Sequence, residues 1–136
     1  MTAAITPFRI HVDDAVLADL HRRLDNTRWP DHETVDDWSQ GLPLAYAREL
    51  CDYWRHGYDW RAREARLNRF AQVMVHLGDV DIHAIHVRSP HPQARPLVMT
   101  HGWPGSIVEF HKVIDALVDP VAHGGLDLFH RVHQAA

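Results

Sequence analysis

The chain has 136 residues, the length of a single domain, and its 46% hydrophobic and 24% charged residues are ordinary for a globular protein. Its net charge is −4 with neutral histidines, and its arginines form no basic patch, so no nucleic-acid partner is expected. One cysteine, Cys51, excludes an intrachain disulfide. No signal-peptide pattern is present, and no apolar run approaches the roughly 18–20 residues of a membrane span. We therefore expect a cytoplasmic protein with no membrane partner.

The first half of the chain has the periodicity of helices, with apolar residues recurring every three or four positions. The expected elements are an extended arm (5–12), a helix capped by Asp13 or Asp14 and ending near Asn26, a loop (28–42), a helix from Pro43 to Gly57, and a shorter helix (about 60–70). We interpret residues 1–70 as one helical segment.

The second half changes to the alternation typical of strands. Residues 71–77 and 80–87 predict a hairpin around the turn Gly78-Asp79, and the continuous apolar run at 97–100 predicts a buried parallel strand. A helix from Ser106 to about residue 117 and a further strand at about 127–133 follow. Residues 71–136 therefore predict the start of an α/β sheet: hairpin, strand, helix, strand.

The most informative stretch is His101-Gly102-Trp103-Pro104-Gly105-Ser106, which lies between the expected strand and the expected helix. A tight Gly/Pro turn at the carboxyl end of a parallel strand directs backbone N–H groups outward, where they can hold a developing oxyanion. A turn that contains glycine and proline for its geometry alone is the simpler alternative.

Several motifs in the same order resemble the epoxide hydrolases of the α/β-hydrolase superfamily, specifically the microsomal-like group with a helical N-terminal domain. They are Ile5-Thr6-Pro7-Phe8, Leu24-Asp25-Asn26-Thr27-Arg28-Trp29-Pro30, Tyr53-Trp54, Tyr58-Asp59-Trp60-Arg61, Glu64, Leu67-Asn68-Arg69-Phe70, Asp81-Ile82-His83, the His101–Ser106 block and Glu109-Phe110. The resemblance covers roughly residues 5–130.

The resemblance implies specific roles for the turn. The backbone N–H of Trp103 would be one oxyanion donor, the Trp103-Pro104 peptide bond would be cis, and His101 would brace a loop that includes Gly102 and Gly105. In this family an aspartate opens the epoxide to form an ester, two lid tyrosines polarise the ring oxygen, and a histidine paired with an acid activates the water that releases the diol. The segment 127–133 would insert between the second and third strands.

The sequence departs from that pattern because it has no nucleophile turn. Gly125-Leu126-Asp127-Leu128-Phe129 and Gly57-Tyr58-Asp59-Trp60-Arg61 each lack the last glycine of Gly-x-Asp-x-Gly, and the three tyrosines precede the sheet. We therefore expect a truncated or split epoxide hydrolase, inactive alone, that acts on an epoxide only when a C-terminal part completes it. The alternatives are a non-catalytic remnant or interaction module, and a related enzyme for a juvenile-hormone-type or other alkyl epoxide.

Thirteen histidines raise the question of a metal site. His83 and His86 would point to opposite faces of a strand, and His123, His130 and His133 lack zinc spacing with supporting Cys or Glu, so neither a metal nor a cofactor is expected. The open edge of the expected sheet and an apolar stripe on the first helix favour self-association.

Overall fold

The computed structural model describes residues 4–125, which form two compact units: His11–Glu64, and a second unit that comprises residues 4–10 and 65–125. The elements are β1 (Ala4–Phe8), α1 (Asp14–Asp25), α2 (Leu44–Asp52), the π-helical turn η1 (Tyr53–Gly57), α3 (Trp60–Leu67), β2 (Gln72–Leu77), β3 (Val80–Ile85), the 3₁₀ turn η2 (Ile107–Phe110) and α4 (Ile114–Val118). None of the helices between residues 4 and 125 is long and apolar enough to cross a membrane.

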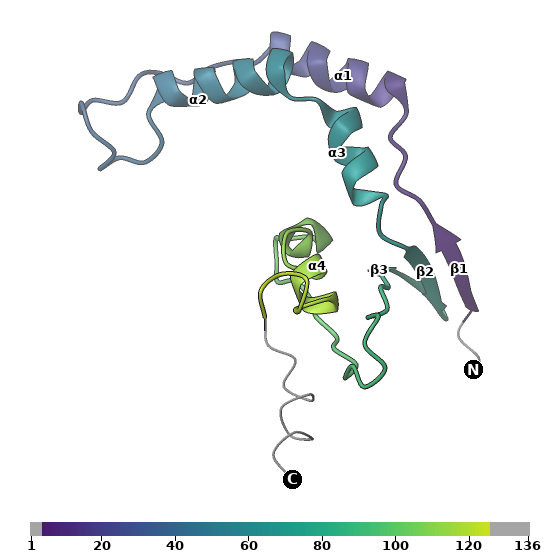
Figure 1. Ribbon diagram of the computed structural model, residues 1–136. Coiled ribbons are helices and arrows are strands. Elements are labelled where there is room, and N and C mark those ends of the chain that lie inside the picture. Colours follow the sequence, from purple (N-terminus) through teal and green to yellow (C-terminus); the bar gives the residue numbers. More distant parts are fainter. Residues whose placement is uncertain (1–3, 126–136) are drawn as a thin grey trace. The chain divides into compact units, whose positions relative to one another are not determined.

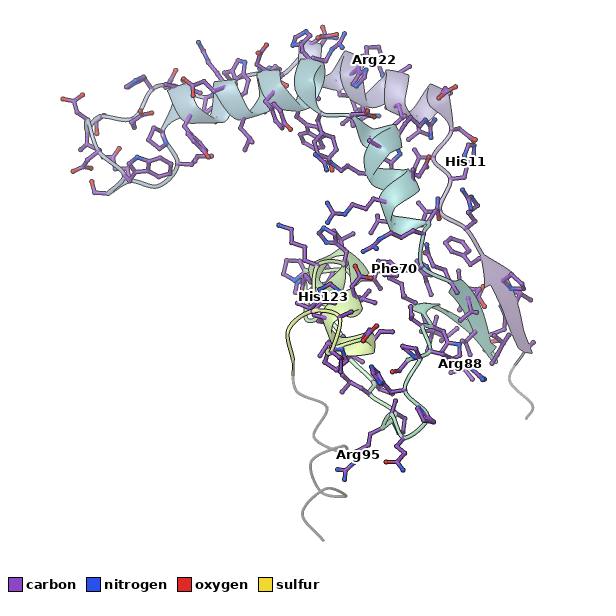
Figure 2. All side chains as sticks on the ribbon, viewed as in Figure 1. His11, Arg22, Phe70, Arg88, Arg95 and His123 are labelled. Carbon is purple, nitrogen blue, oxygen red and sulfur yellow. The ribbon has the colours of Figure 1, made fainter. Side chains whose placement is uncertain are left out.

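In the unit His11–Glu64, η1 continues α2 and contacts α1, and the helices lie along the top of Figure 1. The expected boundaries of both helices are confirmed: α1 ends at Asp25 with Asn26 as its C-cap, and η1 ends at Gly57. On the exposed side of α1, Arg22 pairs with Asp19 (Figure 2). The side chain of Arg55 crosses from η1 to α1, where it donates to Asp25 at 2.8 Å.

Glu64, a buried carboxylate, ties the chain before α1 to α3. It accepts a hydrogen bond from the backbone N–H of Val12 at 2.7 Å and further bonds from Trp60 and Arg61. The Val12 hydrogen bond, followed by the Arg61 guanidinium, holds the pKa of the Glu64 carboxyl below its usual value, although burial opposes the shift. Glu64 therefore stays ionised, and the arm is fixed by charge-assisted hydrogen bonds.

The sheet has the order β1–β2–β3 and is antiparallel throughout. The predicted hairpin is confirmed, with Gly78 at φ +62° in its two-residue turn, a conformation that glycine adopts without strain. The return strand ends at Ile85, two residues earlier than expected. The first residues of the expected extended arm form β1 and pair with β2, a pairing that the sequence analysis did not predict. Pro7 is tolerated in this strand because β1 lies at the edge of the sheet.

Two amide side chains, half-buried Asn68 and buried Gln72, hold the sheet to the end of α3. The Asn68 side chain accepts a hydrogen bond from the backbone N–H of Ile10 at 2.9 Å and donates one to the carbonyl oxygen of Ile10 at 2.7 Å. Gln72, 5% exposed, donates to Leu67 O at 3.0 Å and to Asn68, and its carbonyl oxygen lies 2.8 Å from His83 Nε2. Because the amide nitrogen of Gln72 is already used, its oxygen accepts, and His83 carries a proton on Nε2.

The buried apolar side chains of the sheet unit are Leu67, Phe70 (labelled in Figure 2) and Ile114. Two side-chain pairs hold α4 to its surroundings: Arg69 with Asp115, and His91 Nε2 with Asp119 at 3.0 Å. The hydrogen bond with His91 is the main reason why the pKa of the Asp119 carboxyl is lowered.

The expected strand at 97–100 is wrong for this structure, since the segment lies in no strand. Leu97 and Val98 are 64% and 86% exposed. A strand exists through ladder hydrogen bonds to a neighbour, and no segment within residues 4–125 pairs with this one. The expected neighbour, 127–133, falls outside the described residues. The helix expected from Ser106 is divided, with η2 and α4 separated by a turn at residues 111–113.

Candidate active site

The candidate oxyanion turn, residues 101–105, closes on itself within the sheet unit. The backbone N–H of Gly105 donates to Gly102 O at 2.7 Å, and the Trp103-Pro104 peptide bond between them is cis, which confirms the expected geometry. A four-residue turn with cis-proline in the third position is a type VI turn. The sequence therefore sets the shape of this turn without help from a flanking strand.

The turn presents Trp103 outward. Trp103 is 98% exposed, and its backbone N–H takes no part in the backbone hydrogen bonds that close the turn within residues 4–125. An amide that the fold does not use can donate to an incoming oxygen atom. The predicted brace from His101 is a single local contact, with Nδ1 3.2 Å from Gly102 O.

Gly105 is the most crowded position of the turn. A Cβ there would lie 2.9 Å from Gly102 O and would overlap the carboxylate of Glu109, whereas a Cβ on Gly102 would meet nothing within 4 Å. Glutamate can move aside, but the carbonyl of Gly102 is the acceptor that closes the turn. Glycine at 105 is therefore required by close approach and glycine at 102 is not.

Ser106 connects the turn to η2. Its Oγ accepts from the Val108 N–H at 3.3 Å, and its carbonyl accepts from the Glu109 N–H at 3.0 Å, so it caps the helical turn that follows. Glu109 is brought back over Gly105 by this geometry. Sequence analysis did not single out the Glu109–Gly105 contact, although a four-residue separation across a helix start could have indicated it.

No catalytic partner for the turn lies among the described residues. Asp59, in one of the two near misses to a nucleophile motif, caps α3 by accepting from the Ala62 N–H at 2.9 Å, which is a structural role. Tyr53 and Tyr58 belong to the other unit, where their rings meet edge to face. Asp127, in the second near miss, falls outside the described residues.

Histidine clusters do not create a metal centre within residues 4–125, where no group of three or more potential ligands is brought together. His83 contacts the Phe8 ring and Gln72, and burial lowers the pKa of its imidazole. His76 pairs with Asp81 at 2.5 Å. His123 is described, whereas His130 and His133 are not. We find no set of side chains suited to a cofactor in this part of the chain.

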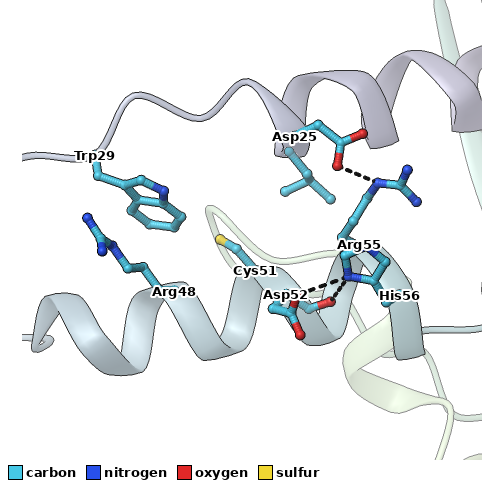
Figure 3. Close-up of a pocket in the computed structure, with 8 residues that line it drawn as sticks. Asp25, Trp29, Arg48, Cys51, Asp52, Arg55 and His56 are labelled. Carbon is cyan, nitrogen blue, oxygen red and sulfur yellow. Dashed lines mark hydrogen bonds and ion pairs between the residues drawn. The ribbon is translucent and has the colours of Figure 1, made fainter.

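A hollow of about 400 Å³ belongs to the helical unit, and no turn residue lines it (Figure 3). Cys51, which is half-buried, is one of its lining residues, and Arg48 lies over the Trp29 ring at 5.6 Å. His56 lies 3.0 Å from the Asp52 carboxylate. The hollow is open and mixed in charge, and it offers no group arranged for nucleophilic or acid–base chemistry.

Comparison with known proteins shows which family the chain belongs to. The family model described as "Epoxide hydrolase N terminus" matches residues 5–110. A protein of Stigmatella aurantiaca named "Putative epoxide hydrolase" is 56% identical over 93% of this chain and 29% of its own length. Epoxide hydrolase 1 of Oryctolagus cuniculus is 38% identical over 89% of this chain and 28% of its own.

Among solved structures, that of the Aspergillus niger epoxide hydrolase matches with a TM-score of 0.75 and 29% identity, over 82% of this chain and 30% of that one. The chain thus spans less than a third of the length of these relatives. It belongs to the epoxide hydrolase family and carries the N-terminal part of an α/β-hydrolase fold.

Proposed function

We propose that this chain supplies the oxyanion turn, residues 101–105, to an enzyme that hydrolyses epoxides to vicinal diols. The observation that carries the proposal is the closed turn, in which Trp103 is 98% exposed and its backbone N–H makes none of the hydrogen bonds that close the turn. The membership of residues 5–110 in the epoxide hydrolase family supports the choice of reaction.

The chemistry has two steps, and the turn acts in the second. A carboxylate attacks an epoxide carbon, the C–O bond of the ring breaks, and the ring oxygen takes a proton from a lid tyrosine, so that a hydroxy ester remains. Water, deprotonated by a base, then adds to the ester carbonyl, whose oxygen becomes an oxyanion before the ester C–O bond breaks and the diol leaves. The Trp103 N–H would donate to that oxyanion.

The attacking carboxylate, the lid tyrosines and the histidine–acid pair would come from polypeptide that this sequence does not contain. The turn alone has nothing to stabilise without the ester, so we expect the isolated chain to form no diol. A cytoplasmic setting is part of the same proposal. A non-catalytic interaction module is the second candidate, because an open strand edge and an unused amide also suit a protein that only binds.

The test joins this chain to the part of the Stigmatella aurantiaca relative that extends beyond the matched segment. We expect the fused protein to hydrolyse an aryl epoxide. Gly105→Ala, which forces the turn open, should lower kcat by about 10²–10³-fold, the usual loss for one oxyanion donor. The matched control Gly102→Ala, which introduces the same methyl group into open space, should retain most of the activity.

Equal activity of both glycine variants would contradict the assigned role of the turn. Diol formation by the purified 136-residue chain at a rate comparable to that of the fused protein would contradict the missing-nucleophile account. A fused protein that folds and binds but never turns over would favour the interaction module.

A further inference from the structure

Three polar side chains line up on one face of the sheet, and each comes from a different strand (Figure 1). Thr6 lies in β1, His76 in β2 and Asp81 in β3. Nδ1 of His76 lies 2.5 Å from a carboxylate oxygen of Asp81, and Nε2 of His76 lies 3.2 Å from the hydroxyl oxygen of Thr6. The imidazole is therefore held between a carboxylate and a hydroxyl. These three residues are here called the sheet triad.

The register of the strands explains why the three side chains meet. The backbone N–H of His86 donates to Ala71 O, and hydrogen-bonded pairs of β2 and β3 recur at every second residue from there. His76 and Asp81 are directly opposite each other and fall between those pairs, where facing side chains approach most closely. Thr6 is the diagonal neighbour of His76 across β1 and β2. The backbone itself thus brings the sheet triad together.

The partners of His76 determine where its proton lies. The carboxylate of Asp81 only accepts hydrogen bonds, so Nδ1 of the neutral imidazole carries the proton and Nε2 is an acceptor. The hydroxyl of Thr6 then donates to Nε2. In this arrangement a base can take the proton of a hydroxyl, while a carboxylate orients the base and stabilises the imidazolium that forms.

The sheet triad is open to an incoming molecule. Thr6 is exposed, and the side chains of His76 and Asp81 are 39% and 61% exposed. His83 on the same face differs, because its Nε2 donates to the buried side chain of Gln72. Exposed charged pairs contribute little to stability, so the fold does not require the alignment at His76. The contact of His83 is structural, whereas the sheet triad is placed to react.

The edge strand β1 offers one backbone donor beside the hydroxyl. By the same alternation, Thr6 directs its backbone groups to β2, and Ile5 directs its N–H to the outer edge of the sheet. The N–H of Ile5 is available to an oxyanion that forms at Thr6. A single donor on an open surface stabilises an oxyanion weakly, so this site suits esters that have a good leaving group.

We propose that the sheet triad hydrolyses activated aryl esters of small carboxylic acids through an acyl-threonine. The oxygen of Thr6 attacks the ester carbonyl carbon while its proton passes to Nε2 of His76, and the ester C–O bond breaks as that proton moves to the departing phenolate. Water then attacks the acyl-threonine and gives a proton to Nε2, which returns it to the oxygen of Thr6 as the carboxylic acid leaves. This activity is distinct from epoxide hydrolysis and uses side chains of β1, β2 and β3 alone.

The experiment incubates the 136-residue chain with p-nitrophenyl acetate. It measures release of p-nitrophenol, and peptide mass spectrometry after an acid quench locates the acetyl group. We expect acetyl on Thr6 and a rate at least about tenfold above that of His76→Gln. Thr6→Val, which keeps a β-branched side chain, should lose the acetyl group and fall to the rate of His76→Gln, whereas Thr6→Ser should retain both. Asp81→Asn should lose most of the excess rate, because an amide favours the wrong tautomer of the imidazole.

His56→Gln is the matched control. His56 is exposed and its Nδ1 lies 3.0 Å from the carboxylate of Asp52, but within residues 4–125 its other ring nitrogen meets no hydroxyl. Its loss should change the rate less than about twofold, which separates the sheet triad from the weak catalysis that any exposed imidazole gives. Circular dichroism checks that each variant is folded.

Two results would overturn the proposal. One is a rate of p-nitrophenol release that is unchanged in Thr6→Val. The other is acetyl found only at Lys112, the single lysine of the sequence, or at the N-terminus. Neither result bears on diol formation, so this proposal and the proposed function fail separately.

Discussion

The hairpin β2–β3 and the run 97–100 belong to the same matched family region, yet of these two only the hairpin reaches its expected form. Each strand of the hairpin finds its partner across a two-residue turn, so its ladder needs no distant part of the chain. Residues 101–105 also close locally, through the Gly102–Gly105 hydrogen bond. The run 97–100 needs neighbours on both sides, and within residues 4–125 no strand pairs with it. The parts of this chain that reach their expected structure are therefore those whose hydrogen-bond partners are close in sequence.

The largest expected effect is on stability, and it is measured by comparing a leucine beside the sheet with a leucine in the run 97–100. Leu67→Ala removes a side chain that is buried beside the sheet and should lower the free energy of unfolding by about 2–5 kcal/mol. Leu97→Ala, in the exposed segment, should change it by less than about 0.5 kcal/mol. Urea unfolding followed by circular dichroism measures both. Equal losses would mean that residue 97 is packed as a strand residue.

A second pair of substitutions tests the amide side chains that hold the hairpin. Gln72→Ala leaves Leu67 O and His83 Nε2 without their partner and should cost about 1–3 kcal/mol. The control Gln40→Ala removes an exposed glutamine that bonds Thr34 in the loop before α2, and it should cost less than about 0.5 kcal/mol. If both variants unfold at the same urea concentration, the network does not stabilise the sheet.

The smallest expected effect is a pH dependence of the sheet unit. Burial lowers the pKa of His83 below the value of about 6.5 that it has when unfolded. The unfolded chain therefore takes up a proton at a pH where the folded chain does not, and stability is lost as the pH falls below about 6.5 and through the lowered pKa. His83→Gln cannot titrate and should show a flatter decline between pH 6.5 and 5. Parallel curves would contradict this role.

Much of this arrangement could be predicted from the sequence, for physical reasons. The bounds of α1, the end at Gly57 and the hairpin turn at Gly78 follow from local signals that each carry their own geometry, whereas the cis bond before Pro104 is expected from the family resemblance. The pairing of β1 with β2 could not, because the partner of Ile5 lies 70 residues away and no local pattern records it. The Glu109–Gly105 contact and the hydrogen bonds of Gln72 join residues that are close in sequence, but they depend on side-chain orientation, which the pattern of residue types does not record.

The most direct test of the central claim replaces one backbone N–H group of the turn with an oxygen atom. In the fused protein, an ester in place of the amide between Gly102 and Trp103 deletes the proposed oxyanion donor and leaves the side chain unchanged, and an ester between His101 and Gly102 serves as the control. We predict that kcat for diol formation falls about 10²–10³-fold for the first protein and much less for the second. An unchanged kcat without the Trp103 N–H would contradict the account.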